Sequence, residues 1–411
     1  MNRLLPAVFL AQKLLLVVSY WFHRLTMPAS ARGSIDWVVG PDELASVVFH
    51  VRRSLPGSYS VCFTQDGAYD FDYDYRYRAQ SSLRMRAWRK LFFGPLLLGR
   101  LLNLSRGFLY VGATGFLVDA FDHREFEFRF IKRRGARLGI YWCGSEIRST
   151  RVMHELEQRT GLPNISTYIG WVSGYYETEQ HERVQQARAR VGDAYADVMF
   201  DFPTDQASYL THHREPYFYL MPDDRVVDDL SKFDDLSTIV VTHATTSPII
   251  KGTPLVRAAV AQLKSEGYEF EYNELMNISN EQLLSELARS HIALNQFYGF
   301  TTTIFGVEAM AAGCALLASS DATVETNLPP HANEAMMVTK HWQVYENLKA
   351  LLNQPERIRP LAVAGQRWVR SYAMSSSTGV LLKGILDRVL DGTYDVEARR
   401  SLTVAEVYEG A

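Results

Sequence analysis

The chain has 411 residues, of which 47% are hydrophobic and 22% charged, with a formal net charge of −3. This composition excludes a disordered chain, and the near-neutral charge argues against a nucleic-acid partner. At roughly 100–200 residues per domain, the length predicts two domains. The three cysteines, Cys62, Cys143 and Cys314, lie far apart, without disulfide or metal-site spacing, which fits a reducing compartment.

The N-terminus is strongly apolar. Leu4 to Phe22 is interrupted only by Gln12, Lys13 and Ser19. As a helix this segment is about 28 Å long, barely enough for a hydrocarbon core of about 30 Å. Burying Lys13 in the hydrocarbon core would cost about 2.5–3.5 kcal/mol. The sequence is therefore as consistent with a helix that lies on the membrane as with one that spans it. A cleaved signal peptide remains the alternative.

A second segment also favours a membrane surface. Residues 75–118 contain eight Arg or Lys and no Asp or Glu, and within 82–106 these alternate with Leu, Met, Trp and Phe. We therefore expect segments 1–26 and 82–106 to dock on an anionic membrane surface. This predicts a location on the cytoplasmic face of the membrane, either peripheral or with one N-terminal anchor. An ordinary core helix with a basic rim is the alternative for 82–106.

From Ile35 onward, short apolar runs alternate with amphipathic ones, which is typical of βαβ units and parallel sheets. In the first half the predicted strands are 35–39, 59–63, 108–111 and 138–142, with helices at 42–55 and 123–134. In the second half the predicted strands are 238–242, 268–272, 292–296 and 315–319, with helices at 253–265, 281–290 and 304–312. Further helices are expected at 342–352 and 356–390, before a tail with little periodicity.

A polar, Pro-containing interruption at 217–234 marks a domain boundary. We expect a hydrophobic segment 1–34, a domain 35–222 that binds the acceptor, a domain 223–391 that binds the donor, and a tail 392–411. The predicted fold class is α/β, with two Rossmann-like, doubly wound domains that face each other across a cleft. Ligands of such sheets bind outside the carboxyl ends of the strands.

Two loops carry the strongest chemical signals. The stretch from Tyr298 to Ser319 reads as a Gly-Thr loop, a helix and a buried strand, and it places the amides of Thr301, Thr302 and Thr303 at a helix N-terminus. Such amides bind phosphate, and Glu308, one turn inside the helix, is suited to accept hydrogen bonds from ribose hydroxyls. A packing helix with a solvent-facing Glu308 is the alternative.

The second loop, His243 to Thr253, follows the first strand of the second half and contains Lys251. A lysine at this edge supplies a positive charge for a diphosphate, unless it is an ordinary solvated lysine.

Together, Lys251-Gly-Thr and Glu308-Ala-Met-Ala resemble family-four retaining glycosyltransferases of GT-B fold, mainly over 239–372. Gly40 before a helix is similar to the N-terminal glycine loop of that family, and Cys143-Gly-Ser-Glu-Ile-Arg148 to its His-Gly-Ser-Asp-x-Arg segment. The resemblance implies a nucleotide-diphospho-sugar donor, with Lys251 as diphosphate ligand and Glu308 as ribose ligand. We add Gly40, His243, Gly299 and Thr301–Thr303 as donor-binding candidates, and Glu146 as a catalytic candidate beside Lys251 and Glu308.

The chain departs from the family pattern at three positions. Phe300 stands where a first Glu is common, Thr245 where an Arg is frequent, and Cys143 where the family has His. Glu146 and Arg148 follow a predicted strand, which makes them candidates for the acceptor or donor-sugar side. The alternative for Glu146 is a carboxylate that satisfies backbone amides at a helix start.

The acidic run Asp70-Phe-Asp72-Tyr-Asp74 is reminiscent of metal–nucleotide motifs, but its period of two favours packed tyrosines and solvated aspartates. We therefore expect no metal and no cofactor. The predicted function is metal-independent transfer of a hexose from a nucleotide sugar to a lipid-linked or membrane-proximal glycan, with retention. The alternatives are a catalytically degenerate scaffold subunit and a sugar-nucleotide epimerase of the same fold.

Overall fold

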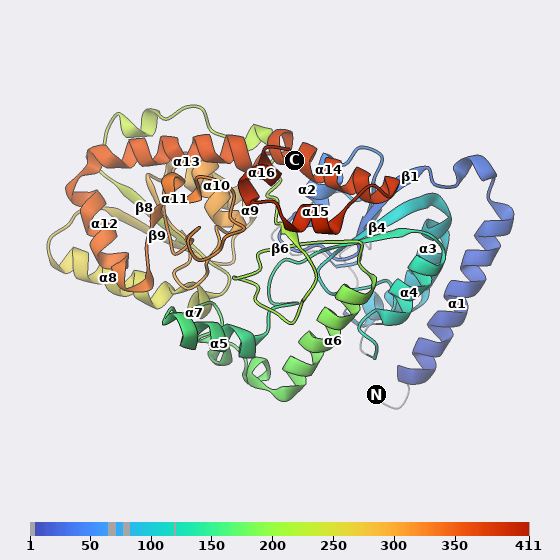
Figure 1. The fold of residues 1–411 in the computed structure, drawn as a ribbon. Helices are drawn as coiled ribbons and strands as arrows, with labels where there is room; N and C mark the ends of the chain where they lie inside the picture. Colours follow the sequence, from blue (N-terminus) through green and yellow to red (C-terminus); the bar gives the residue numbers. More distant parts are fainter. Residues whose placement is uncertain (1–4, 65–70, 77–82, 119–120, 411) are drawn as a thin grey trace.

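The structure is a computed structural model that describes residues 5–64, 71–76, 83–118 and 121–410, with the backbone alone for residues 5 and 83–89. Two α/β domains lie side by side, and the N-terminal helix lies at the outer edge of the first (Figure 1). Asp70 lies outside the described residues, as do the side chains of Arg84, Arg86 and Arg89.

The first domain contains a seven-stranded sheet in which every described strand pair is parallel. Its order is β3 (Tyr75–Arg76), β2 (Tyr59–Cys62), β1 (Ile35–Gly40), β4 (Ser105–Val111), β5 (Arg137–Tyr141), β6 (Val198–Asp201) and β7 (Glu215–Pro216). Its helices are α1 (Leu5–Thr26), α2 (Val47–Ser54), α3 (Leu83–Leu104), α4 (Glu125–Arg133), α5 (Thr150–Thr160) and α6 (Glu179–Tyr195). The central strands are buried on both faces, as expected of a parallel sheet covered by helices.

The second domain contains a five-stranded parallel sheet. Its order is β12 (Met337–Val338), β11 (Ala315–Ala318), β10 (Ile292–Leu294), β8 (Val240–Ala244) and β9 (Glu271–Leu275). Its helices are α7 (Pro248–Lys251), α8 (Thr253–Ser265), α9 (Asn280–Arg289), α10 (Ile304–Ala311), α11 (Ala332–Ala335), α12 (Val344–Asn353) and α13 (Ile358–Tyr372). Each of β8 and β10 is followed by a loop and then a helix at the same sheet edge, which is where both motif loops lie.

The end of the chain returns to the first domain. The predicted helix 356–390 is divided at Ala373–Met374, where Met221 forms a parallel bridge to Met374. Beyond it, α14 (Ser375–Asp391) packs on α2, and Gly379 approaches Ser54 so closely that a Cβ would lie 2.9 Å from its Cβ. Residues 375–391 therefore belong with the first domain and not, as predicted, with the second.

The tail also differs from the prediction. It forms α15 (Val396–Arg400) and α16 (Val404–Tyr408), two short capped helices. Arg399 donates to both oxygens of Glu215 at 2.8 Å, and Tyr394 donates to the same carboxylate at 2.8 Å. This buried contact fixes the tail to strand β7.

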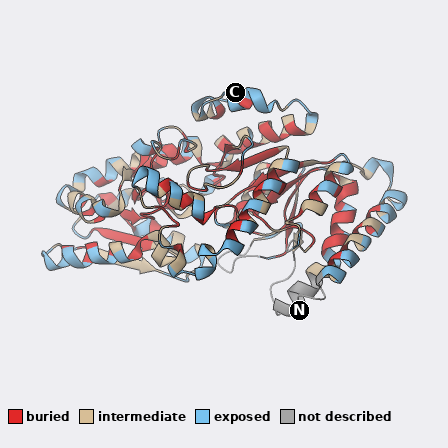
Figure 2. Cartoon of the chain, turned by 60° about the horizontal axis from the view of Figure 1, so that its bottom comes forward, coloured by how far each residue is buried: buried red, intermediate tan, exposed pale blue. Residues whose placement is uncertain are grey.

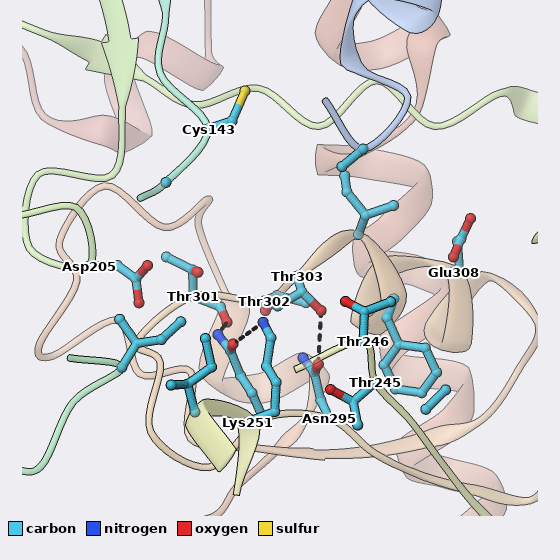
Figure 3. Close-up of a pocket in the computed structure, with 18 of the residues that line it drawn as sticks. Cys143, Asp205, Thr245, Thr246, Lys251, Asn295, Thr301, Thr302, Thr303 and Glu308 are labelled. Carbon is cyan, nitrogen blue, oxygen red and sulfur yellow. Dashed lines mark hydrogen bonds between the residues drawn. The ribbon is translucent and has the colours of Figure 1, made fainter. Parts of the chain in front are cut away.

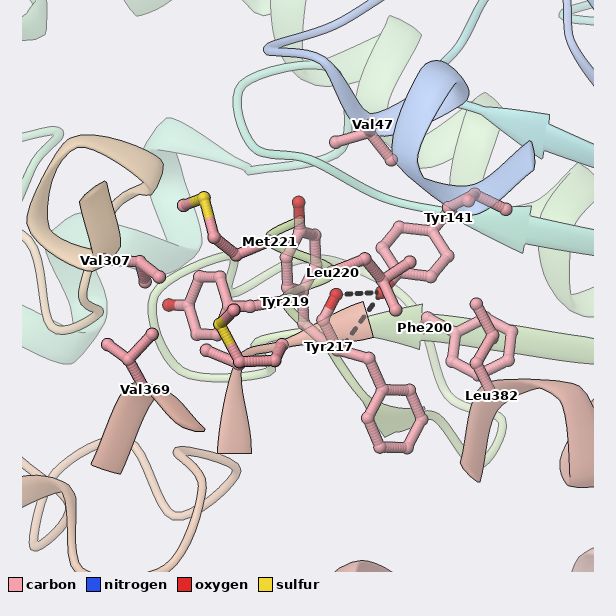
Figure 4. Packing of buried hydrophobic residues seen from close by; sticks show 14 of the residues in the cluster. Val47, Tyr141, Phe200, Tyr217, Tyr219, Leu220, Met221, Val307, Val369 and Leu382 are labelled. Carbon is pink, nitrogen blue, oxygen red and sulfur yellow. Dashed lines mark hydrogen bonds between the residues drawn. The ribbon is translucent and has the colours of Figure 1, made fainter. Parts of the chain in front are cut away.

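One buried apolar cluster runs through the contact between the domains. Tyr141, Tyr217 and Tyr219 of the first domain meet Val307 and Val369 of the second in this cluster, and Leu382 of α14 joins it (Figure 4). The hydroxyl of Tyr141 donates to the carbonyl of Phe218 at 2.6 Å and accepts from its amide at 2.8 Å. Burial of these rings stabilises the contact between the two domains.

Helix α1 packs along α3, and polar groups specify the contact. Pro95 has no N–H, so the carbonyl of Leu91 loses its partner within α3; Gln12 supplies it, with Nε2 to O 3.0 Å. The hydroxyl of Ser19 donates to the carbonyl of Leu96 at 2.8 Å. Two of the three polar residues that interrupt the apolar N-terminal segment, Gln12 and Ser19, are thus hydrogen-bonded to α3.

Candidate active site

A cavity of about 450 Å³ lies between the two domains, at the carboxyl ends of the strands. Lys251, Thr301, Thr302, Thr303 and Glu308 line it from the second domain, together with Thr245 and Thr246. Arg148 and Asp205 line it from the first. The structure therefore brings together both motif loops that the sequence singled out.

The Gly-Thr loop presents unused donors to the cavity. Among the described residues, none accepts a hydrogen bond from the amides of Thr301, Thr302 or Thr303. The loop is held by its other groups: Gln296 donates to the carbonyl of Thr301 at 2.9 Å, and Tyr219 donates to that of Thr302. Thr303 caps α10 through its hydroxyl, which accepts from the Gly306 amide at 3.3 Å. Free amides on a fixed loop at a helix N-terminus bind an anion.

Lys251 closes this anion site from the opposite loop. It is the last residue of the short helix α7, and its Nζ lies 2.5 Å from Oε1 of Gln296 (Figure 3). Desolvation in the cavity lowers the pKa of Lys251 to about 8, while Asp205 opposes and Arg148 adds to this effect. A bound diphosphate would favour the protonated lysine.

Glu308 lies at the other end of the cavity from Asp205 (Figure 3). It is buried and accepts a hydrogen bond from Nδ2 of Asn280 at 2.7 Å. Burial raises its pKa to about 7, although Asn280 and Arg225 favour the charged form. Glu308 is not the solvent-facing residue of the alternative interpretation, and its carboxylate is available to accept further hydrogen bonds.

Four predicted site residues are described but do not line the cavity. His243 is fully buried: its Nδ1 lies 2.8 Å from the carbonyl of Leu294, and its Nε2 lies 2.8 Å from Oγ1 of Thr253. It ties β8 to β10 and α8, a structural role. Glu146 accepts from the amides of Cys143 and Gly144, as the alternative interpretation proposed.

The other two are glycines required by close packing. A Cβ on Gly40 would lie 2.2 Å from the carbonyl oxygen of Val61, and one on Gly299 would lie 2.0 Å from Nε2 of Gln296. At both positions a glycine is needed because a side chain would clash with its neighbours, and neither glycine lines the cavity.

The sequence interpretation missed Asp205, Gln296 and Asn280. Asp205 follows β6, and Gln296 follows β10, so the rule that ligands bind at the carboxyl ends of strands could have found both. Asn280 begins α9, and only its contact with Glu308 reveals its role.

The acidic run behaves as its period predicts where it is described. Asp72 and Asp74 are exposed, while Phe71 stacks on Phe49 with ring centroids 4.0 Å apart. Asp74 accepts from the amide and hydroxyl of Ser60, both at 2.8 Å, and from Arg52 at 3.0 Å. Within the described parts of the chain, no group of three or more His, Cys, Asp or Glu side chains is arranged to hold a metal ion.

The chain matches no protein-family model and no curated protein sequence. Solved structures are nevertheless similar over most of its length. Sucrose-phosphate synthase from Thermosynechococcus elongatus has a TM-score of 0.59 at 11% identity, covering 87% of this chain and 100% of that one. WaaG, a glycosyltransferase involved in lipopolysaccharide biosynthesis, has a TM-score of 0.55 at 10% identity, covering 85% and 100%.

The catalytic domain of starch synthase IV from Arabidopsis thaliana, bound to ADP and acarbose, has a TM-score of 0.52 at 10% identity, with 87% and 100% covered. At these identities the similarity concerns the fold. The two parallel sheets with their alternating helices fit a two-domain α/β fold of this kind. The chain therefore has the GT-B fold, with two Rossmann-like domains facing each other across a cleft.

Proposed function

We propose that this chain is a glycosyltransferase that uses a nucleotide-diphospho-sugar donor, needs no metal, and acts on a lipid-linked or membrane-proximal glycan acceptor. One observation carries the proposal: Lys251, three unused amides and a buried Glu308 line one cavity of a GT-B fold. The amides and the lysine suit a diphosphate, and the carboxylate suits a ribose.

The arrangement supports chemistry at the sugar carbon that bears the diphosphate. The bond from this carbon to the diphosphate oxygen breaks with its electron pair on the oxygen, where Lys251 and the amides stabilise the charge. The acceptor hydroxyl forms the new bond and releases its proton to the departing phosphate or to solvent. Retention is proposed from the family resemblance, and the anomeric configuration of the product by proton NMR tests it.

Thermal shift against nucleoside diphosphates and their sugars tests the donor assignment. A binder gains stability by mass action, about 2.7 kcal/mol at a hundredfold excess over its Kd. Release of nucleoside diphosphate from the bound sugar nucleotide without acceptor identifies an active transferase. Binding without release would indicate the scaffold subunit, and epimerised but intact sugar nucleotide would indicate the epimerase. No shift with any compound would contradict the proposal.

An outer apolar stripe on α1 supports the membrane-proximal acceptor. It consists of Leu10, Leu14, Val18, Trp21 and Leu25, spaced three or four residues apart and all exposed. Phe92, Phe93 and Leu96 of the neighbouring α3 are exposed as well, and Figure 2 shows exposed residues along the outer side of α1. Exposed Arg24 and Arg100 on the same two helices suit an anionic lipid surface.

By length and composition, Pro6–Thr26 is the one described helix that could cross a membrane. Crossing would remove Gln12 and Ser19 from their partners on α3, which favours the surface position. For the same reason, deleting 1–26 would also damage the fold of the first domain. Point substitutions in the stripe are the cleaner test.

We expect the protein to co-sediment with vesicles of equal parts phosphatidylcholine and phosphatidylglycerol, and less with phosphatidylcholine alone. Leu14→Glu with Val18→Glu should reduce this binding strongly. Val380→Glu, at a similarly exposed apolar position on α14 (67% against 61% for Leu14), should not. Adding Arg84→Glu, Arg86→Glu and Arg89→Glu should abolish binding. Pelleting that is equal for both vesicle types and insensitive to salt would contradict an electrostatic contribution.

A further inference from the structure

Arg148 and Asp205 form a pair on the first-domain wall of the cavity. Nη2 of Arg148 donates to Oδ2 of Asp205 at 2.9 Å, and Nε donates to the backbone carbonyl of Asp205 at 2.6 Å. The two side chains are only 11% and 6% exposed. Because its guanidinium donates to both the carboxylate and the backbone carbonyl of Asp205, Arg148 has a fixed position.

Asp205 also holds the pair against the second domain. Its Oδ1 accepts from the amide of Phe300 at 2.7 Å, and its own amide donates to the buried Glu325 at 2.8 Å. The Phe300 ring packs with Met153, Leu156 and Ile165 of the first domain. The guanidinium is thereby positioned beside the loop whose next three amides are unused.

One donor group of Arg148 remains available. Among the described residues, none accepts a hydrogen bond from Nη1, which lies close enough to the loop before α5 that a Cβ on Gly144 would be 3.9 Å from it. Gly144, like Arg148, lines the cavity. Arg148 and Lys251 are the only two basic residues among the described lining, and they come from opposite domains.

A diphosphate carries more negative charge than one lysine neutralises. From the second domain, Lys251 and the amides of Thr301–Thr303 reach one side of the anion; the first-domain side is lined by Arg148. We infer that Arg148 is the second cation of the diphosphate site, so that the donor site is completed across the cleft. This inference rests on the proposed function, because it takes the anion to be a nucleotide diphosphate.

The electrostatics agree with this geometry. Arg148 acts on the free lysine by lowering its pKa, and Asp205 acts in the opposite sense. An anion bound between the two cations relieves their repulsion. Arginine suits this place because its planar fork donates to Asp205 and to a phosphate at once, which an ammonium group on a flexible stem does less well.

Arg148→Met alone would leave the buried Asp205 carboxylate unpaired, so the test uses Asp205→Asn as its background. This variant keeps an oxygen for the Phe300 amide, and Arg148 keeps its bond to the backbone carbonyl. We expect the single variant to bind inorganic pyrophosphate at least as tightly as the wild type in calorimetry. Adding Arg148→Met should weaken binding about 10- to 100-fold, the range for losing a charged hydrogen-bonding partner.

Two further variants separate charge from structure. The pyrophosphate affinity of Arg148→Lys in the wild-type background should lie between those of the wild type and the double variant. Arg151 lies three residues after Arg148, is exposed and is paired with Glu179. The variant Arg151→Met should therefore bind pyrophosphate like the wild type. Affinity for the free nucleoside of the diphosphate that gives the largest thermal shift should stay unchanged in all of these variants, whereas a merely structural role would lower it too.

Equal pyrophosphate binding by Asp205→Asn and by the double variant would overturn the inference. If Lys251→Ala weakened binding in the same series, the proposed diphosphate site would stand without Arg148. If Lys251→Ala and the Arg148 variants all bound like the wild type, the diphosphate site itself would be wrong.

Discussion

The two domains use the same sheet edge but position their functional groups differently. In the second domain, Lys251 and Thr301–Thr303 follow β8 and β10. Gln296 of the same domain bonds to Lys251 and to Thr301, and Tyr219 of the first domain donates to the carbonyl of Thr302. In the first domain, Arg148 is fixed by Asp205, 57 positions away in the chain. Both sides of the cavity therefore depend on contacts between residues far apart in the chain, and the second domain differs in that its cavity-lining groups lie in two recognisable motifs.

The two domains also differ in what has been added to them. The second is a sequence of βα units, whereas the first carries α1 and α3 on one side and receives α14 to α16 from the end of the chain. A domain built of regular βα units thus faces a domain with additional surfaces. We expect substitutions in the second domain to affect donor chemistry, and substitutions in the additions to affect stability or membrane binding.

The largest expected effect comes from breaking the contact between the tail and the first domain, in which Arg399 and Tyr394 bind Glu215. Arg399→Ala leaves Glu215, which is fully buried, without its bidentate partner, and should lower the free energy of unfolding by about 3–5 kcal/mol in urea titration. Arg400→Ala removes the adjacent exposed arginine, paired with Glu397, and should change little. Equal stability of the two variants would show that the tail is not part of the first domain.

The pH dependence of this contact has a defined sign. Burial alone would raise the pKa of Glu215, but hydrogen bonds from Arg399 and Tyr394, together with the His213 ring 3.5 Å away, outweigh it and lower the pKa to about 2. The contribution to stability is therefore fully present above the ordinary carboxyl pKa and is lost as the pH falls from there through about 2. Arg399→Ala should reduce this acid-dependent loss of stability.

The next effect tests whether the chemistry depends on the second domain. Lys251→Ala removes the cation nearest the departing diphosphate and should slow sugar transfer by about a hundredfold or more. Lys264→Ala, on the surface of α8, is the matched control and should transfer sugar at the wild-type rate. Unchanged transfer by a folded Lys251→Ala protein would place the active site elsewhere.

The sequence predicted the second domain well for a physical reason. Its elements have local signals: α8 spans Thr253–Ser265 as predicted, and α10 ends one residue before the predicted position. In the first domain, α2 begins at Val47, and not at Asp42, because Glu43 accepts from the amides of Val48 and Phe49, 3.0 Å each. When a helix is capped by a residue several positions before its first turn, the spacing of apolar residues does not show where the helix begins.

The site was predicted in part for the same reason. Lys251, Glu308 and the amides of Thr301–Thr303 follow from loop position and helix geometry. His243 was wrongly placed in the site because the sequence shows where a strand ends but not which of its final side chains turn inward. Asp205 and the tail contacts of Arg399 depend on pairings across the chain, which residue spacing does not specify.

A smaller effect distinguishes the two ends of the cavity. Glu308→Gln keeps the shape but removes a charged acceptor, and should weaken nucleoside diphosphate binding by about 1.5–3 kcal/mol. Pyrophosphate, which lacks the ribose, should bind this variant as it binds the wild type. Glu286→Gln, at a half-buried position of α9 where it pairs with Arg289, serves as control. Loss of pyrophosphate binding in Glu308→Gln would contradict the division of the cavity into ribose and diphosphate ends.

The pH profile of binding should reflect both ends. Burial raises the pKa of Glu308 to about 7, so nucleoside diphosphate affinity should fall as the pH drops through that value and the carboxylate is protonated. Desolvation lowers the pKa of Lys251 to about 8, so affinity should also fall as the pH rises through that value. Glu308→Gln should remove only the acidic limb and Lys251→Met only the basic limb. A profile that is flat from pH 6 to 9 in the wild type would contradict both assignments.

The smallest expected effect is that of chelation. If Lys251 and Arg148 supply the positive charge for the diphosphate, EDTA should leave sugar transfer unchanged. Asp74 of the acidic run is already bonded within the fold, since its Oδ2 accepts hydrogen bonds from Ser60 and Arg52, which lower its pKa against the effect of burial. Asp74→Asn should therefore lower stability and leave the rate at saturating donor unchanged. Complete loss of transfer in EDTA, restored by magnesium or manganese, would show that a divalent ion shares the neutralisation here assigned to the two basic side chains.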